Sequence, residues 1–173
     1  RFPAGAINYC LEEGRIGPSD LSAAVYHDNP VLTFDRVLRS FLHVAPRGGE
    51  LWQKAATKLL GTKLRVREAI QDTLQADVPV LYSEHHISHA ASAYFCSPFD
   101  EAALLTFDGV GEWSTTTMGI GRDTDLSITQ ELHFPHSIGL LYSAFTAFLG
   151  FEVNEGEYKV MGMAPYGSPR YVD

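Results

Sequence analysis

The feature that most constrains the fold is a short apolar run that leads directly into a segment of small residues. Residues 78–82 are apolar and bounded by polar residues, which is typical of a short buried strand. Residues 84–93 follow, and their alanines and serines predict a helix that packs closely against its neighbours. The sequence therefore predicts a short strand followed at once by a closely packed helix.

This predicted helix carries two histidines on one face. His85 and His89 are four residues apart, so their Cβ atoms would lie about 5–6 Å from each other. Both imidazoles could then reach one metal ion at about 2.0–2.1 Å, the distance typical of zinc–histidine bonds. His86 points elsewhere and could contact a substrate at most. Histidines at a strand–helix junction can also simply hydrogen-bond to the backbone, and the spacing alone favours neither interpretation.

Size, charge and cysteine content exclude several classes of protein. A chain of 173 residues, 45% of them hydrophobic, is long enough for one domain or two small lobes with a core. A formal net charge of −8 argues against nucleic-acid binding, because no broad basic surface is available. No apolar run approaches about 18 residues, so we expect no membrane span. Cys10 and Cys96 are expected to be buried free thiols in a reducing cytoplasm.

The hydrophobic pattern changes near residue 98. The part before it is dominated by helical spacing, with helices expected over residues 3–14, 29–46 and 50–74. The last of these stretches would be one or two helices, with Gly61 a possible joint. The part after it has three apolar stretches that predict strands, over residues 102–107, 113–121 and 126–134. Residues 138–150 then predict a helix that is apolar nearly all round, as expected for one buried on more than one side.

A second stretch with chemical potential is the glycine-rich turn between the first two of these strands. Gly109 and Gly111 would allow positive φ and let backbone N–H groups approach an anion. Asp108, at the strand end, could hold a metal-bound water or a ribose, and the threonines at 115–117 could donate to phosphate. An Asp-Gly turn is also ordinary hairpin chemistry, so both interpretations stay open.

Lys159 is a third candidate. It follows Gly156 and Glu157 in what looks like a helix start, where N–H groups and a cation could face an anion. A solvated surface charge in a salt network with Glu155 and Glu157 is the other interpretation.

Four blocks together resemble a known family. Residues 84–93, 107–113, 134–142 and 156–167 are similar, in the same order, to the NodU/CmcH-type O-carbamoyltransferases. The resemblance implies an actin-like ATPase (ASKHA) carbamoyltransferase domain of class α/β, of which this chain is a part. Residues 1–98 would be the helix-rich end of the first lobe, ending in the histidine helix. Residues 99–173 would be the β-β-β-α start of the second lobe, with its glycine-rich phosphate hairpin.

The resemblance also implies the chemistry. A carbamoyl group would pass from carbamoyl phosphate, through an ATP-derived carbamoyl-adenylate, to a hydroxyl of a sugar, an antibiotic or a nodulation-factor-like acceptor. His85 and His89 would bind a divalent metal, with iron the usual suggestion, and would form the catalytic centre together with Asp108. The residues facing ATP would be Asp108, Gly109, Gly111, Glu112, Thr115 and Lys159.

The chain also departs from that family's pattern. A first phosphate hairpin, a later aspartate expected to complete the metal site, and the domain that makes the adenylate are missing from the sequence. We therefore expect a piece of a longer cytoplasmic protein, with little activity by itself and with exposed apolar surface that favours a homodimer. The alternatives are an actin-like sugar kinase or ATPase and a non-catalytic metal- or nucleotide-binding module. A zinc hydrolase is disfavoured, because Ile87 and Ser88 stand where its general-base glutamate would be.

Overall fold

The computed structural model describes residues 2–170, except the side chains of residues 51, 58, 60 and 62. Helices and small sheets alternate along the chain, which confirms the predicted mixed α/β class. Contacts divide the chain into two compact units, residues 1–88 and 89–173, and the boundary falls inside helix α5 (His85–Tyr94). Arg1 and residues 171–173, which the predicted lobes include, lie outside the described residues. The assignment of residues 1–98 and 99–173 to two actin-like lobes stays a prediction.

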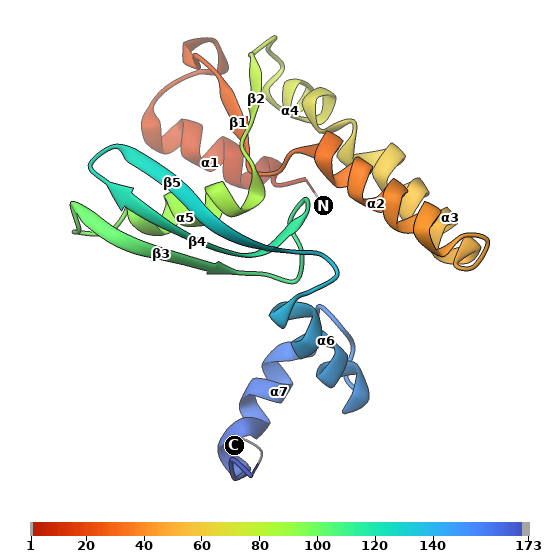
Figure 1. Ribbon diagram of the computed structural model, residues 1–173. Helices are drawn as coiled ribbons and strands as arrows, with labels where there is room; N and C mark the ends of the chain where they lie inside the picture. Colours follow the sequence, from red (N-terminus) through yellow and green to blue (C-terminus); the bar gives the residue numbers. More distant parts are fainter. Residues whose placement is uncertain (1, 171–173) are drawn as a thin grey trace. The chain divides into compact units, whose positions relative to one another are not determined.

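The first unit joins two short parallel strands through helices (Figure 1). Strands β1 (Ala24–Tyr26) and β2 (Val80–Tyr82) pair in parallel, with Ala24 opposite Val80. The elements around them are α1 (Ala4–Gly14), α2 (Pro30–Val44), α3 (Gly49–Lys58), a π-helical turn (Leu59–Lys63) and α4 (Val66–Leu74). The break between α3 and α4 confirms the joint predicted near Gly61. A parallel pair needs a long crossover connection, and α2 to α4 supply it here.

The core of this unit lies along one face of α4. Val66, Ile70 and Leu74 recur at four-residue spacing and are buried together with Val78. Burying each such side chain contributes about 1.5–3 kcal/mol. The predicted burial of the strand at 78–82 was wrong for its second half, because Leu81 and Tyr82 are 55% and 40% exposed. A sheet of only two strands leaves them uncovered within their unit.

The second unit contains a three-stranded antiparallel sheet with α5 on one face. Its strands are β3 (Glu101–Phe107), β4 (Ser114–Arg122) and β5 (Asp125–His133), and they lie in that order in the sheet. The sequence predicts all three strands. Ala90 and Tyr94 of α5 pack on Leu104 of β3. Gly121 makes this packing possible, since a Cβ there would lie 2.8 Å from the ring atoms of Tyr94.

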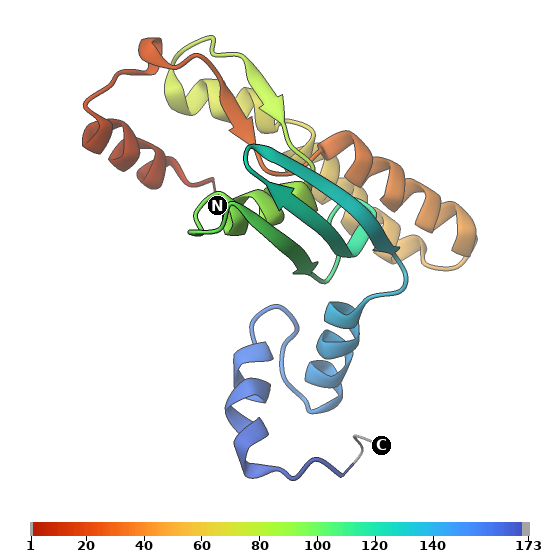
Figure 2. The same ribbon diagram turned by 60° about the vertical axis from the view of Figure 1, so that its left-hand side comes forward.

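The rest of this unit is much less buried. Two helices, α6 (Ile138–Phe148) and α7 (Glu157–Met163), lie next to each other beyond one end of the sheet (Figure 2). The expectation that the apolar helix is buried on more than one side was wrong, since its one buried residue is Thr146. The apolar pattern of a helix shows which of its residues could be buried. In α6, however, the other described residues cover little of the helix surface.

Two further findings concern surface properties. Both cysteines, Cys10 and Cys96, are exposed, so the prediction of buried thiols was wrong. Among the described residues, no helix combines the length and the apolar character that a membrane crossing requires.

Candidate metal centre

Helix α5 presents its histidines from its first two turns. The helix begins at His85, as predicted, and its first turn is closed by the Ser88 N–H donating to the Glu84 carbonyl over 2.9 Å. The Ser88 hydroxyl donates to the same carbonyl over 3.0 Å. His85 is half-buried and His89 exposed, whereas His86 is 3% exposed. The helical spacing therefore separates His86 from the pair, as the sequence predicts.

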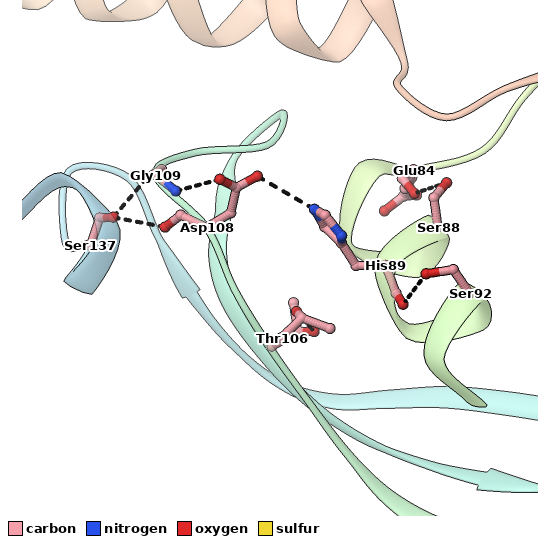
Figure 3. Close-up of polar contacts among 9 residues, drawn as sticks. Glu84, Ser88, His89, Ser92, Thr106, Asp108, Gly109 and Ser137 are labelled. Atoms are coloured by element: carbon pink, nitrogen blue, oxygen red, sulfur yellow. Dashed lines mark hydrogen bonds and ion pairs between the residues drawn. The ribbon is translucent and has the colours of Figure 1, made fainter. Parts of the chain in front are cut away.

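Asp108 faces His89 from the end of β3. Its backbone N–H donates to the Thr115 carbonyl over 2.8 Å, which closes the hairpin at this residue. The N–H of Gly109 donates to Asp108 Oδ1 over 2.6 Å. The other carboxylate oxygen, Oδ2, lies 3.6 Å from His89 Nε2 (Figure 3). The carboxylate is thus oriented by its own turn, with one oxygen toward the imidazole.

The three side chains form a donor set for a cation. One ligand atom from each of His85, His89 and Asp108 lies within 4.8 Å of the other two. Two imidazole nitrogens and one carboxylate oxygen are the donors of the non-haem Fe(II) facial triad, and they also suit zinc. The residues therefore fit a divalent cation. The sequence predicts the two histidines as metal ligands. The family resemblance implied a later aspartate as the carboxylate ligand, and it implied a role for Asp108 in catalysis and in nucleotide binding.

A hollow of about 330 Å³ adjoins His89 between α5 and β3. It is lined by His89, Ala90, Ser92 and Ala93 of α5, and by Leu104, Leu105, Thr106 and Phe107 of β3. This volume is near the lower end of small-molecule sites. The hollow is large enough for part of a ligand, which would lie next to His89.

The glycines of the turn do not play the predicted conformational role. Neither Gly109 nor Gly111 adopts positive φ, so the expectation based on left-handed backbone was wrong. The Gly111 N–H donates to the Ser114 carbonyl over 2.9 Å and belongs to the hairpin's own bonding. Glu112 is 5% exposed. These hydrogen bonds are within the hairpin, and Gly109 reaches the site through its bond to Asp108.

The predicted phosphate contacts lie in different surroundings. Thr115 is fully buried, and its hydroxyl donates to the carbonyls of His136 (2.6 Å) and Leu132 (3.1 Å). Lys159 is exposed on α7, with its Nζ 5.7 Å from the centre of the Phe151 ring. Nucleotide contacts by Thr115 and Lys159 stay predictions.

Comparison with known proteins gives a consistent answer over the whole chain. The sequence model of a family described as "Carbamoyltransferase N-terminus" matches residues 1–173. An uncharacterized protein of Synechocystis sp. is 49% identical over 180 residues, which cover 99% of this chain and 29% of that protein.

Two relatives have names that refer to nodulation. Nodulation protein NolNO of Sinorhizobium fredii is 30% identical over 175 residues, covering 98% of this chain and 24% of NolNO. Nodulation protein NolO of Bradyrhizobium diazoefficiens is 40% identical over 87 residues, covering 49% of this chain and 15% of NolO. The chain spans less than a third of the length of each of these three relatives.

Proposed function

Because the chain belongs to the carbamoyltransferase N-terminus family, we propose that it forms the cation-binding part of an O-carbamoyltransferase. The observation that carries this proposal is the donor set of His85, His89 and Asp108, whose ligand atoms lie within 4.8 Å of one another. The hollow beside His89 adds space for a substrate group. The chain spans less than a third of its longer relatives, so the complete reaction is proposed for the full-length polypeptide.

The proposed reaction transfers a carbamoyl group to a hydroxyl. Carbamoyl phosphate, water and ATP would yield a carbamoyl-adenylate, with release of phosphate from carbamoyl phosphate and of pyrophosphate from ATP. The acceptor oxygen would then bond to the carbamoyl carbon while the bond from that carbon to the adenylate oxygen breaks, releasing AMP and a proton. The acceptor would be a sugar, an antibiotic or a nodulation-factor-like molecule. The names of the two nodulation relatives support the last of these.

The chain's residues would bind and orient the reactants. A divalent cation, iron by our proposal, would supply Lewis acidity toward phosphate or carbamoyl oxygens. His85 and His89 would hold it through neutral ring nitrogens and Asp108 through Oδ2, because Oδ1 already accepts from the Gly109 N–H. Three protein donors leave positions open for substrate oxygens, which is the arrangement of catalytic rather than structural sites.

We further propose that the β3–β4 hairpin contacts ATP within an actin-like fold. Support comes from the antiparallel β3–β4–β5 sheet followed by α6, the order expected at the start of the second lobe. Asp108 and Gly109 would provide the nearest contacts to a nucleotide at the cation. Gly111, Glu112 and Thr115, which are buried, would shape the turn, and exposed Lys159 would pair with phosphate.

A transfer assay tests this function directly. Full-length polypeptide would be incubated with carbamoyl phosphate, ATP and a panel of sugar hydroxyl acceptors, with and without a chelator. We expect carbamoylated product and AMP, both lost with the chelator and in His89→Ala, and both retained in the control His43→Ala, which changes an exposed histidine on α2. A phosphorylated acceptor with ADP release would instead identify a kinase. Activity unaffected by both the chelator and His89→Ala would contradict the cation site.

A further inference from the structure

The turn that carries Asp108 is held from outside by the start of α6. The Ser137 hydroxyl lies 2.7 Å from the Gly109 carbonyl and 3.2 Å from the Asp108 carbonyl, and it is the donor to both (Figure 3). The same oxygen accepts the Leu140 N–H over 3.0 Å and so caps α6. One side chain therefore fixes both the helix start and the two consecutive peptide groups that follow Asp108.

Gly139 brings the helix into direct backbone contact with this turn. A Cβ at residue 139 would collide with the Asp108 carbonyl, and it would lie 2.6 Å from both Asp108 C and Gly109 N. All three are backbone atoms, so an added side chain would have to displace the turn. The helix start and the turn are thus packed too closely for any residue larger than glycine.

These contacts form a continuous path to the proposed ligand atom. Ser137 and Gly139 locate the Asp108–Gly109 peptide, the Gly109 N–H holds Asp108 Oδ1, and Oδ2 faces His89. We propose that Ser137 and Gly139 are positioning residues, which fix the Asp108 carboxylate for binding a divalent cation. This inference rests on the proposed cation site. It adds to that site an outer support, the kind of interaction whose loss typically lowers metal affinity about 10–100-fold.

The alternative is that Ser137 is only a helix cap, and the choice of variants separates the two roles. Glycine caps a helix nearly as well as serine but has no hydroxyl to donate. Threonine keeps both the cap and the donor. Ser137→Gly therefore removes the bond to the turn with little effect on the helix, and Ser137→Thr restores it.

The experiment is a Co(II) titration of the full-length polypeptide, followed by the visible absorption of the bound ion, with thermal unfolding measured in parallel without metal. We expect Ser137→Gly and Gly139→Ala to weaken Co(II) binding about 10-fold or more, and Ser137→Thr to restore wild-type affinity. Two controls should leave affinity unchanged. Ser143→Ala removes a hydroxyl of the same helix that binds Glu157 instead, and Gly162→Ala adds a Cβ with no atom within 4 Å.

The possible failures are distinguishable. Wild-type affinity in both Ser137→Gly and Gly139→Ala, together with lost binding in Asp108→Asn, would overturn the positioning role and leave the cation site standing. Two results would show that Ser137 is only a structural cap. One is a loss of Co(II) affinity in Ser137→Gly without wild-type affinity in Ser137→Thr, and the other is an affinity that merely follows the melting temperature across all variants. Absence of Co(II) binding by the wild type would overturn the cation site and this inference together.

Discussion

Asp28 and Asp108 both follow strands, but they lie in opposite kinds of surroundings. Asp28, after β1, has a side chain that is 4% exposed; its Oδ1 accepts from the Thr33 hydroxyl at 3.1 Å and its Oδ2 pairs with Lys63 Nζ at 2.5 Å. The Asp108 side chain, after β3, is 34% exposed. Its Oδ1 accepts from the Gly109 N–H of its own turn, and its Oδ2 lies near the His89 imidazole.

The difference separates a structural carboxylate from a ligand-binding one. A buried carboxylate must be paired, because removing a charge from water is costly, and Lys63 and Thr33 satisfy this need for Asp28. A carboxylate half open to solvent and facing a histidine is instead prepared for a cation. Asp28 and Asp108 share their residue type and their position after a strand. Their different contacts therefore decide which one stabilises the fold and which one can bind a ligand.

The largest expected effect is on cation binding at Asp108. Asp108→Asn removes an anionic ligand, and we expect Co(II) or Fe(II) affinity to fall about 100-fold or more, beyond the usual effect of an outer-shell change. The melting temperature without metal should stay close to wild type. Metal titration and thermal unfolding check both parts, with Asp125→Asn, an exposed aspartate at the start of β5, as the matched control. An equal loss of affinity in Asp125→Asn would reveal a nonspecific charge effect.

The reverse pattern is expected at Asp28. Asp28→Asn leaves Lys63 partly buried without its anion, and we expect the free energy of unfolding to fall by about 2–3 kcal/mol, below the full cost of a fully buried pair because Lys63 is 38% exposed. Cation affinity should not change. Denaturant unfolding measures the loss. Asp35→Asn, which breaks a surface pair with Arg39, should cost only about 0.3–0.5 kcal/mol. Similar costs at both positions would show that burial of Asp28 does not matter.

Thr115 sharpens the comparison, because the sequence predicts a ligand role and the structure shows internal hydrogen bonds. Thr115→Val leaves the Leu132 and His136 carbonyls without their donor, and we expect a loss of about 1–2 kcal/mol in unfolding free energy. Thr115→Ser keeps the donor and should lose less. Chemical denaturation gives these values, and ATP titration of the same variants gives the functional readout. Weakened ATP binding with unchanged stability would instead support the phosphate contact.

Glu157 should give the smallest effect, and one that depends on pH. Its pKa is lowered, first by the hydrogen bond from the Asn154 N–H and also by the bond from the Ser143 hydroxyl. Since the folded state prefers the ionised form, the stabilisation is present above the ordinary pKa of 4.5 and is lost as pH falls through the lowered folded value. We expect Glu157→Gln to melt slightly below wild type at neutral pH, with the difference disappearing in acid. Glu155→Gln serves as an exposed control, and a difference that grows toward acid pH would contradict the sign.

The local sequence pattern predicted the helices and strands well, but it predicted less well which of them pack against each other. The histidine helix, the three antiparallel strands and the joint near Gly61 all follow from short-range periodicity and breakers, and the structure confirms them. The parallel pairing of β1 with β2 could not be predicted, because it depends on how α2 to α4 bring distant strands together. The burial of α6 and of the cysteines was misjudged for the same reason.

The candidate site shows the same limit. Spacing alone placed His85 and His89 on one face, but the third donor comes from a different element. Asp108 stood out in the sequence for its turn, whereas its approach to His89 depends on how α5 packs on the sheet. The support from Ser137 and Gly139 depends on a contact between a hairpin and a helix start that no local pattern encodes.

Anomalous diffraction from crystals of the full-length polypeptide grown with Co(II) would show whether His85, His89 and Asp108 bind one cation. We expect one strong peak within about 2.0–2.2 Å of a ring nitrogen of His85, a ring nitrogen of His89 and an Asp108 carboxylate oxygen, distances typical of such ligands. A fully ordered site without that peak, or a peak whose ligands exclude Asp108, would contradict this expectation.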